Sequence, residues 1–334
     1  MPQVAFLGCG HIHTPGFIKR LQARPSVQVT RVWDHDTERA ARRSSELGAT
    51  ISTPEQVLTD PAIHAVIICS ETHLHRELVL STAASGKHMF VEKPLGFSAE
   101  DARVMSASIA HAGVMFQTGY FMRGTPAVLW LREQIQAGRF GKITRVRAAN
   151  CHAGLLKGWF DGEWKWMADP SQAGCGALGD LGTHVLDLLL WMFGPVREVA
   201  AATGVFDGRH ANCDETGEAL LRFESGAIGT LAGGWLDHAN PAFLQVSGTD
   251  GFAFIHNGDL FVNIPQLAGA DGKSPWQQLP EAWPHAFDLF LDAIEGKAGV
   301  PLVPVEEAAA CNIVMAAIYQ AAAQRRWVSI GADS

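Results

Sequence analysis

Several features that define other protein classes are scarce in this sequence. Basic residues are outnumbered, with 26 Lys and Arg against 34 Asp and Glu, which gives a formal net charge of −8. This balance disfavours nucleic acid as the main partner, because phosphate binding needs a basic surface. Charged residues make up only 18% of the chain and hydrophobic residues 47%, which excludes a disordered polyelectrolyte and supplies sizeable cores.

Long apolar runs and a recognisable export signal are also lacking. The apolar stretches are short and interrupted, so we expect no segment to span a membrane. The start, MPQVAFLGCGHIH, has no basic region followed by a long apolar stretch. The six cysteines form no C-x-x-C pair, which fits reduced thiols better than a disulfide framework or a zinc site. The sequence therefore predicts a soluble, cytoplasmic protein.

The order of the expected elements divides the 334 residues into two domains. Over residues 1–122, short apolar strands alternate with helices, which is typical of parallel strands joined by right-handed crossovers. Over residues 123–334, a strong helix at Asp180–Phe193 is followed by closely spaced strands with Gly-containing turns. The pattern predicts an α/β domain with a parallel sheet, and then an α+β domain with a large, mostly antiparallel open sheet.

The first expected strand, Gln3–Leu7, runs into the loop Gly8-Cys9-Gly10. Glycine at these positions allows a sharp turn and a close approach to a pyrophosphate, as in Rossmann dinucleotide-binding domains. The second expected strand ends at Asp34, whose carboxylate can accept a hydrogen bond from an adenosine ribose 2′-OH and repels a 2′-phosphate. These features predict NAD in preference to NADP, and the alternative is a tight strand–helix turn without a ligand.

His13 stands where the third glycine of a G-x-G-x-x-G pattern would fall. Thr14-Pro15 follows it and indicates a delayed helix start, because proline suits the first helical turn. His11 and His13 form an H-x-H pair, but no acidic or thiol side chain accompanies them at ligand spacing, so we expect no metal. We interpret both histidines as polar loop residues beside the pyrophosphate.

Two further motifs carry groups able to move protons. Glu92-Lys93-Pro94 follows the fourth expected strand, at the sheet edge where ligands of open α/β sheets bind. Asp180 and His184 are four residues apart and therefore project from one helix face, where a carboxylate can orient an imidazole acting as general base. Taken singly, the motifs are also consistent with a surface turn and with a capping Asp beside a buried His.

Taken together, these motifs resemble the Gfo/Idh/MocA oxidoreductases (glucose–fructose oxidoreductase, inositol dehydrogenase and relatives). The resemblance covers essentially the whole chain. It implies that Lys93 hydrogen-bonds the reacting oxygen, that His184 takes the hydroxyl proton, and that Asp180 orients the substrate and His184. It also implies a Lys93–Pro94 bond that is often cis. Two positions depart from the family pattern: Phe121 replaces a polar residue, and Ser70-Glu71-Thr72 replaces a Thr-Pro-x turn, which leaves Glu71 unexplained.

The motifs and the resemblance together define the expected site. The expected catalytic residues are Lys93, Asp180 and His184. The expected cofactor-binding residues are Gly8, Gly10, His11, Ile12, His13, Asp34, Ser70, His75, Glu92 and Lys93. The expected substrate-binding residues are Tyr120, Arg123, Trp159, Trp164, Asp180 and His184. The tryptophans before the Asp180 helix suit the C–H face of a sugar, but packing within the loop or at a subunit interface explains them equally well.

Three functions are compatible with these residues. The first is an NAD(P)-dependent dehydrogenase that acts on a CH–OH carbon of a sugar, cyclitol or sugar acid. The second is an enzyme that uses tightly bound NAD transiently for sugar isomerisation, elimination or glycoside hydrolysis. The third is a non-catalytic sugar sensor, which would have no need of Lys93, Asp180 and His184. A broad apolar sheet face also predicts a homodimer or homotetramer.

Overall fold

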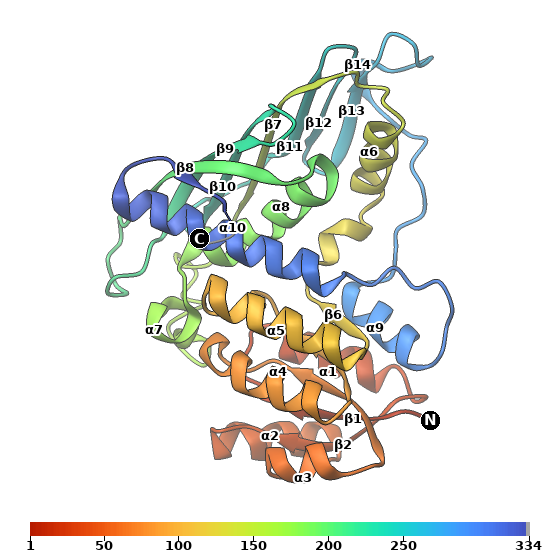
Figure 1. Ribbon diagram of the computed structural model, residues 1–334, viewed down its shortest axis with the longest axis vertical. Coiled ribbons are helices and arrows are strands. Elements are labelled where there is room, and N and C mark those ends of the chain that lie inside the picture. Colours follow the sequence, from red (N-terminus) through yellow and green to blue (C-terminus); the bar gives the residue numbers. More distant parts are fainter. Residues whose placement is uncertain (332–334) are drawn as a thin grey trace.

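The computed structural model describes residues 1–331, so the last three residues of the expected second domain lie outside the described residues. Two sheets organise the chain (Figure 1). The first has six parallel strands in the order β3-β2-β1-β4-β5-β6. This is the order of a Rossmann domain, and it confirms the predicted fold class.

Most strands and helices of the first domain lie where the alternation of strands and helices predicts them. Three short elements, β3, α3 and η1, were not predicted. The elements are β1 (Gln3–Leu7), α1 (Thr14–Gln22), β2 (Gln28–Trp33), α2 (Thr37–Leu47), β3 (Thr50–Ile51), α3 (Pro54–Thr59), β4 (Ile63–Ile68), η1 (Thr72–Leu74), α4 (His75–Ala84), β5 (His88–Val91), α5 (Ala99–Ala112) and β6 (Phe116–Thr118).

The second sheet has nine strands in the order β14-β13-β12-β11-β7-β10-β9-β8-β15. It is mixed, because β7 and β10 pair in parallel while its other neighbouring strands are antiparallel. The strands β14 and β15 and the short helices η2, η3 and α7 were not predicted. The elements are η2 (Phe121–Gly124), α6 (Pro126–Gln136), β7 (Ile143–Cys151), η3 (Lys165–Ala168), α7 (Pro170–Ala173), α8 (Ala177–Phe193), β8 (Val196–Gly204), β9 (Thr216–Phe223), β10 (Ile228–Gly234), β11 (Ala242–Gly248), β12 (Phe252–His256), β13 (Asp259–Asn263), β14 (Asp271–Pro275), α9 (Ala286–Ile294), α10 (Val305–Gln324) and β15 (Val328–Ser329).

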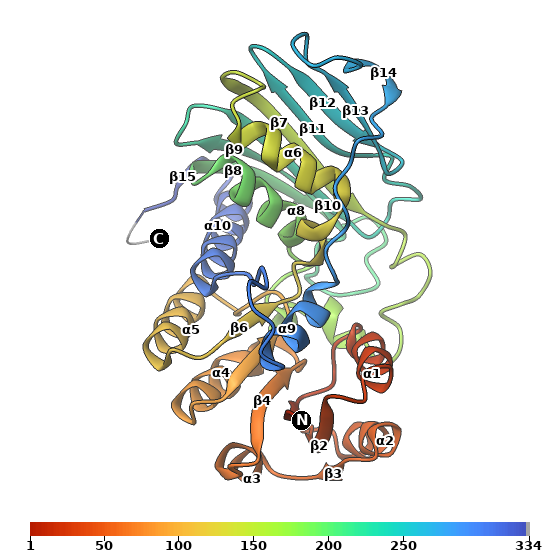
Figure 2. The ribbon, with the colours of Figure 1, turned by 90° about the vertical axis from the view of Figure 1, so that its right-hand side faces the viewer.

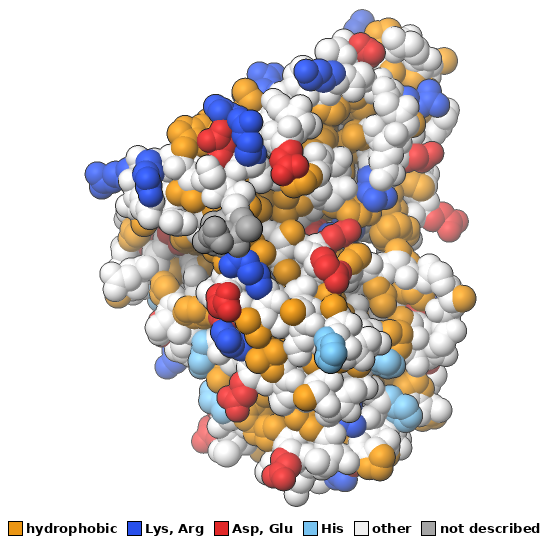
Figure 3. Space-filling model, viewed as in Figure 1, with side chains coloured by type: hydrophobic (Ala, Val, Ile, Leu, Met, Phe, Trp, Pro, Cys, Tyr) orange, Lys and Arg blue, Asp and Glu red, His pale blue; other side chains and the backbone are white. Residues whose placement is uncertain are grey.

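Helices on one face of the large sheet connect it to the parallel sheet. α8 is almost entirely buried and packs against β7, β9 and β10. α10 packs on α8 and β8 and also on α5 of the first domain (Figure 1). The first turn of α8 is thereby brought toward the carboxyl ends of the parallel strands. On the face shown in Figure 3, acidic and basic side chains are intermixed.

The late helix α9 returns to the Rossmann sheet. Figure 2 shows it beside α1 and β6. Phe287, Phe290 and Leu291 belong to the same apolar cluster as Phe17 and Phe90 of the first domain. The rings of Phe287 and Phe17 stack with centroids 4.4 Å apart. The predicted division near residue 122 stays a prediction, and α9 contributes to the core of the earlier segment.

None of the helices in residues 1–331 combines the length and apolar content needed to cross a bilayer. All six cysteines are free thiols.

Replacing Phe287 with Ala should destabilise the protein by about 3–5 kcal/mol, because it removes a fully buried ring. Urea unfolding measures this loss. Phe206→Ala is a matched control, because Phe206 is 77% exposed, and it should change stability by less than about 0.5 kcal/mol. Equal stability of the two variants would contradict the packing assigned to α9.

Candidate active site

The loop after β1 has the geometry of a pyrophosphate cradle. Gly8 adopts a φ of +87°, and a Cβ there would overlap Ser70 at the end of β4. A Cβ on Gly10 would lie 3.0 Å from Glu71 Oε1. α1 begins at Thr14, after His13 as its N-cap, which confirms the delayed helix start. These residues fit NAD, since side chains at either glycine would fill the space against β4.

The side chain of His75 contacts the backbone beside the Glu92-Lys93-Pro94 turn. The Lys93–Pro94 peptide is cis. The buried His75 ring places Nδ1 3.2 Å from the carbonyl oxygens of Pro94 and Leu95, and Nε2 3.3 Å from the Ser70 carbonyl oxygen. His75 therefore links the end of β4 to the turn after β5. In this structure Ser70 and His75 support the loops around the cradle.

The turn brings Lys93 against Asp180 of α8. Lys93 Nζ donates to Asp180 Oδ1 at 2.7 Å, and the indole N–H of Trp235 donates to Asp180 Oδ2 at 3.0 Å. Burial alone would raise the pKa of Asp180, but the Lys93 ammonium holds it below its usual range. Burial likewise opposes the charge of Lys93, yet Asp180 and Glu92 raise its pKa. Both groups are thus ionised.

His184 follows one helical turn after Asp180 but does not bond to it. This corrects the expectation that Asp180 orients the imidazole, because the carboxylate is engaged by Lys93 and Trp235. His184 is 4% exposed, and its Nδ1 has no hydrogen-bond partner among the described residues. Burial, and then the charge of Lys93, lower its pKa well below 6.5. The ring is therefore neutral and able to accept a proton.

These groups line one cavity of about 280 Å³ between the two sheets. Two polar residues at the end of β7, Asn150 and His152, also line it and were missed by sequence reasoning. Their position at the carboxyl end of a long strand was the available signal. The lining residues are Ile12, His13, Lys93, Phe121, Met122, Asn150, His152, Trp159, Phe160, Met167, Asp180, Leu181 and His184.

Three expected substrate residues do not line this cavity. The hydroxyl of Tyr120 lies 3.0 Å from Thr183 Oγ1 in the core. Arg123 is buried against Asp187 and also donates to Glu307. Trp164 packs against the apolar cluster of the loop before α8. Of the expected tryptophans, Trp159 reaches the cavity.

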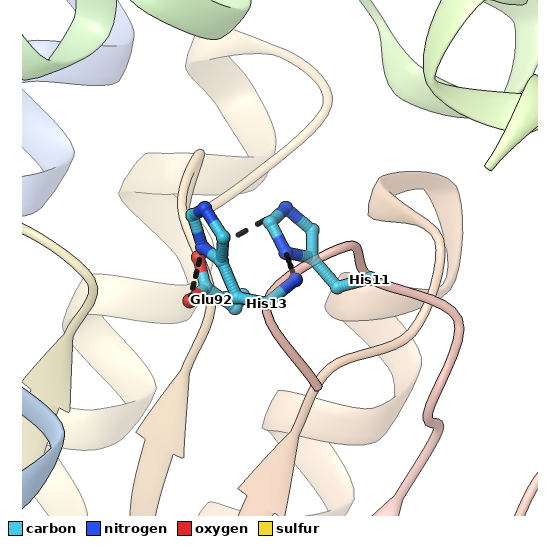
Figure 4. Close-up of side chains that lie close together, drawn as sticks. All are labelled: His11, His13 and Glu92. Atoms are coloured by element: carbon cyan, nitrogen blue, oxygen red, sulfur yellow. Dashed lines mark hydrogen bonds and ion pairs between the residues drawn. The ribbon is translucent and has the colours of Figure 1, made fainter. Parts of the chain in front are cut away.

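Figure 4 shows His11, His13 and Glu92 close together, and His13 lines this cavity. Their ligand atoms lie within 4.8 Å of one another, so Glu92 supplies the acidic partner that no local spacing revealed. Burial lowers the pKa of His11 to about 3, so its ring is neutral. Its Nδ1 accepts the His13 backbone N–H at 3.2 Å, which leaves the ring proton on Nε2, the atom facing Glu92. In this tautomer the nitrogen facing Glu92 has no lone pair for a metal, and the absence of a metal stays a prediction.

The same reasoning assigns the tautomer of His13. Burial opposes the charge of Glu92, yet the hydrogen bond with His13 and the nearby Lys93 ammonium hold the pKa of Glu92 below its usual range. Glu92 is therefore an acceptor, and His13 Nδ1 donates to its Oε1 at 3.1 Å. The hydrogen bond thus assigns a proton to His13 Nδ1. His13 is thus a carboxylate-bound imidazole lining the cavity, not merely a polar loop residue.

Nitrogen NMR of the histidine rings should find His11 and His184 neutral from about pH 8 down to about pH 5, because burial lowers both pKa values below the ordinary 6.5. The proton of His11 should reside on Nε2. His184→Gln assigns the second signal. A titration of either ring near pH 6.5 would contradict the assigned burial.

Two family models match the chain. The one described as "Oxidoreductase family, NAD-binding Rossmann fold" covers residues 3–120, and the "GFO/IDH/MocA C-terminal domain" covers residues 128–254. The two matches correspond to the parallel sheet and to most of the large sheet. The N-terminal domain is thus an NAD-binding Rossmann domain.

Three curated relatives are 27–29% identical to the chain over the residues that align. Levoglucosan dehydrogenase of Pseudarthrobacter phenanthrenivorans is 27% identical over 68% of this chain and 65% of its own length. The chain therefore covers slightly less than two thirds of that protein. The 1,5-anhydro-D-fructose reductase of Ensifer adhaerens is 29% identical over 80% of this chain and 81% of its own length. The scyllo-inositol 2-dehydrogenase (NAD(+)) of Bacillus subtilis is 28% identical over 79% and 75%.

Solved structures share the fold over nearly the full length. An NAD binding oxidoreductase from Klebsiella pneumoniae superposes with a TM-score of 0.81 at 24% identity, covering 99% of both chains. Levoglucosan dehydrogenase in complex with NADH and L-sorbose superposes with a TM-score of 0.83 at 22% identity, also covering 99% of both.

Proposed function

Because this chain belongs to the Gfo/Idh/MocA family of oxidoreductases, we propose that it oxidises a hydroxyl-bearing carbon of a small carbohydrate-like molecule, with NAD as acceptor. Sugars, cyclitols and sugar acids are the substrate classes. The observation that carries the proposal is the convergence of Lys93, Asp180 and His184 on one cavity. An ammonium, a carboxylate and a neutral imidazole in one buried space are the set that alcohol oxidation requires.

NAD, when bound, supplies the hydride acceptor of the reaction. Lys93 holds the substrate oxygen and stabilises negative charge on it as its proton leaves. His184 accepts that proton, since burial keeps its imidazole neutral at physiological pH. Asp180 fixes the position of the Lys93 ammonium and is itself held by Trp235. All four side chains are buried, which strengthens the electrostatic interactions among them.

The remaining lining suits a hydroxylated ligand. Trp159 offers an aromatic face for C–H groups, while Asn150 and His152 offer polar atoms for hydroxyls. Substrate names among the relatives agree with this chemistry: levoglucosan, 1,5-anhydro-D-fructose and scyllo-inositol. We extend that chemical class, and no single one of these substrates, to the present chain.

Purified protein supplied with NAD and a panel of sugars, cyclitols and aldonates should form NADH with at least one member. Lys93→Met and His184→Ala should each lower kcat by at least about 100-fold, because charge stabilisation and proton transfer each contribute about that much. Lys297→Met is a control that removes an exposed ammonium paired with Asp292. Full activity of His184→Ala would exclude it as the base.

We further propose that the outer face of the large sheet joins two copies of the chain. α8 covers the inner face, whereas Leu220 and Ile228 on the outer face are 37% and 49% exposed. Phe254 and Phe261 stack on this outer face with centroids 4.8 Å apart. An apolar sheet face of this kind is usually covered by another subunit.

The cytoplasm is the proposed location, because its reducing conditions suit six unpaired thiols.

Light scattering should give the mass of a dimer or tetramer for the wild type and of a monomer for Phe254→Glu, because a charge on this face opposes its burial. Ile51→Glu is the control, since Ile51 is exposed at the far edge of the parallel sheet. A monomeric wild type would contradict the proposed assembly and would leave the catalytic proposal unaffected.

A further inference from the structure

A buried cluster of charges connects the carboxyl ends of β2 and β4. Arg39, in the first turn of α2, donates to Asp34 through Nε at 2.8 Å and Nη2 at 2.7 Å. The same Nη2 donates to Glu71 Oε1 at 2.8 Å. Arg39 and Glu71 are only 5% and 3% exposed. One guanidinium therefore bridges two carboxylates beside the nucleotide loop.

Asp34, the expected ribose acceptor, is already saturated. Its Oδ2 accepts from the Cys9 N–H at 2.7 Å and from Arg39 Nε. Its Oδ1 accepts from the Asp36 N–H at 2.9 Å and from Arg39 Nη2. A carboxylate offers about four lone-pair sites, and these four bonds use them. The expectation that Asp34 binds the ribose hydroxyl is therefore not met in this arrangement.

Glu71 retains an unused hydrogen-bond acceptor, which Asp34 lacks. Its Oε2 is buried without a hydrogen-bond partner, and His35 Nδ1 lies 3.5 Å away. Its Oε1 lies 3.0 Å from the position of a Cβ on Gly10, the second glycine of the cradle. That glycine is the one whose missing side chain lets a dinucleotide approach. The other oxygen of the same carboxylate, Oε2, is the unsatisfied one, and a buried acceptor of this kind indicates a missing hydrogen-bond donor.

We propose that Glu71 selects NAD over NADP by presenting the free carboxylate to the adenosine ribose. The inference rests on the proposed function in one respect, that a nicotinamide dinucleotide binds at the Gly8–Gly10 loop. Glu71 Oε2 accepts the ribose hydroxyl in place of the saturated Asp34. A 2′-phosphate cannot donate a hydrogen bond in this way, and its charge is repelled.

The charges of the cluster strengthen this selection. Asp34 and Glu71 contribute two negative charges and Arg39 one positive charge, so the three groups together carry −1. A 2′-phosphate adds about −1.5 to −2 at neutral pH. Arg39 would be the natural phosphate ligand, but its guanidinium is held by both carboxylates. Glu71 therefore acts twice, as an acceptor and as the restraint on Arg39.

The test measures the binding of NADH and of NADPH to the protein without substrate, with nucleotide fluorescence as the readout. Glu71→Gln keeps the side-chain size and removes the charge. It should lower the ratio of the NADPH Kd to the NADH Kd by at least about tenfold, the effect of one nearby charge. Glu46→Gln is the matched control. It removes a carboxylate paired with Arg43 on the same helix, outside the cluster, and should keep the wild-type ratio.

An unchanged ratio in folded Glu71→Gln protein would overturn the inference, as would an equal change in Glu46→Gln. Glu71→Thr carries the same expectation if the glutamine variant does not fold. In the double variant Glu71→Gln/Arg39→Gln, the part of the increase in relative NADPH affinity that comes from the released guanidinium should be lost. A wild type that binds neither nucleotide would remove the proposed function, and this inference with it. Normal NADH binding with an unaltered ratio would remove the inference alone.

Discussion

The ion pair between Lys93 and Asp180 is the contact on which the rest of the site depends. Lys93 comes from the turn after β5 of the parallel sheet, and Asp180 from the first turn of α8 beneath the large sheet. Burying two charges is costly unless they meet at short distance and their remaining atoms are bonded. The 2.7 Å contact and the Trp235 N–H meet that condition. Since each domain supplies one partner, the two sheets must be docked in one arrangement for either charge to be stable.

This pairing also determines what His184 can do. The carboxylate nearest to it on α8 serves the ammonium, so the imidazole has no acidic partner and stays neutral. His13, by contrast, is bonded to Glu92 beside the cofactor cradle. His184 and His13 thus line one cavity with imidazoles of different character, the first desolvated and the second oriented by a carboxylate.

Much of the fold could be predicted from the sequence, and the reasons for the misses are physical. α2, β7 and α10 lie where their periodicity and bounding residues place them. β3 and β15, of two residues each, exist only through pairing with β2 and β8, which no local pattern encodes. Individual site residues such as Lys93 and Asp180 could likewise be predicted. The partner of each carboxylate could not be predicted, because tertiary packing decides whether Asp34 binds a ribose or Arg39.

The position of α9 has a consequence for how the chain is made. The ribosome releases the first parallel strands long before Phe287, Phe290 and Leu291 exist, yet these three side chains complete the apolar cluster around Phe17 and Phe90. The nascent Rossmann segment therefore leaves the exit tunnel with an uncovered hydrophobic surface, and domain-by-domain folding during translation cannot finish. The earliest-made domain is therefore closed by a helix that is made much later, and its apolar cluster is complete only after α9 has left the ribosome.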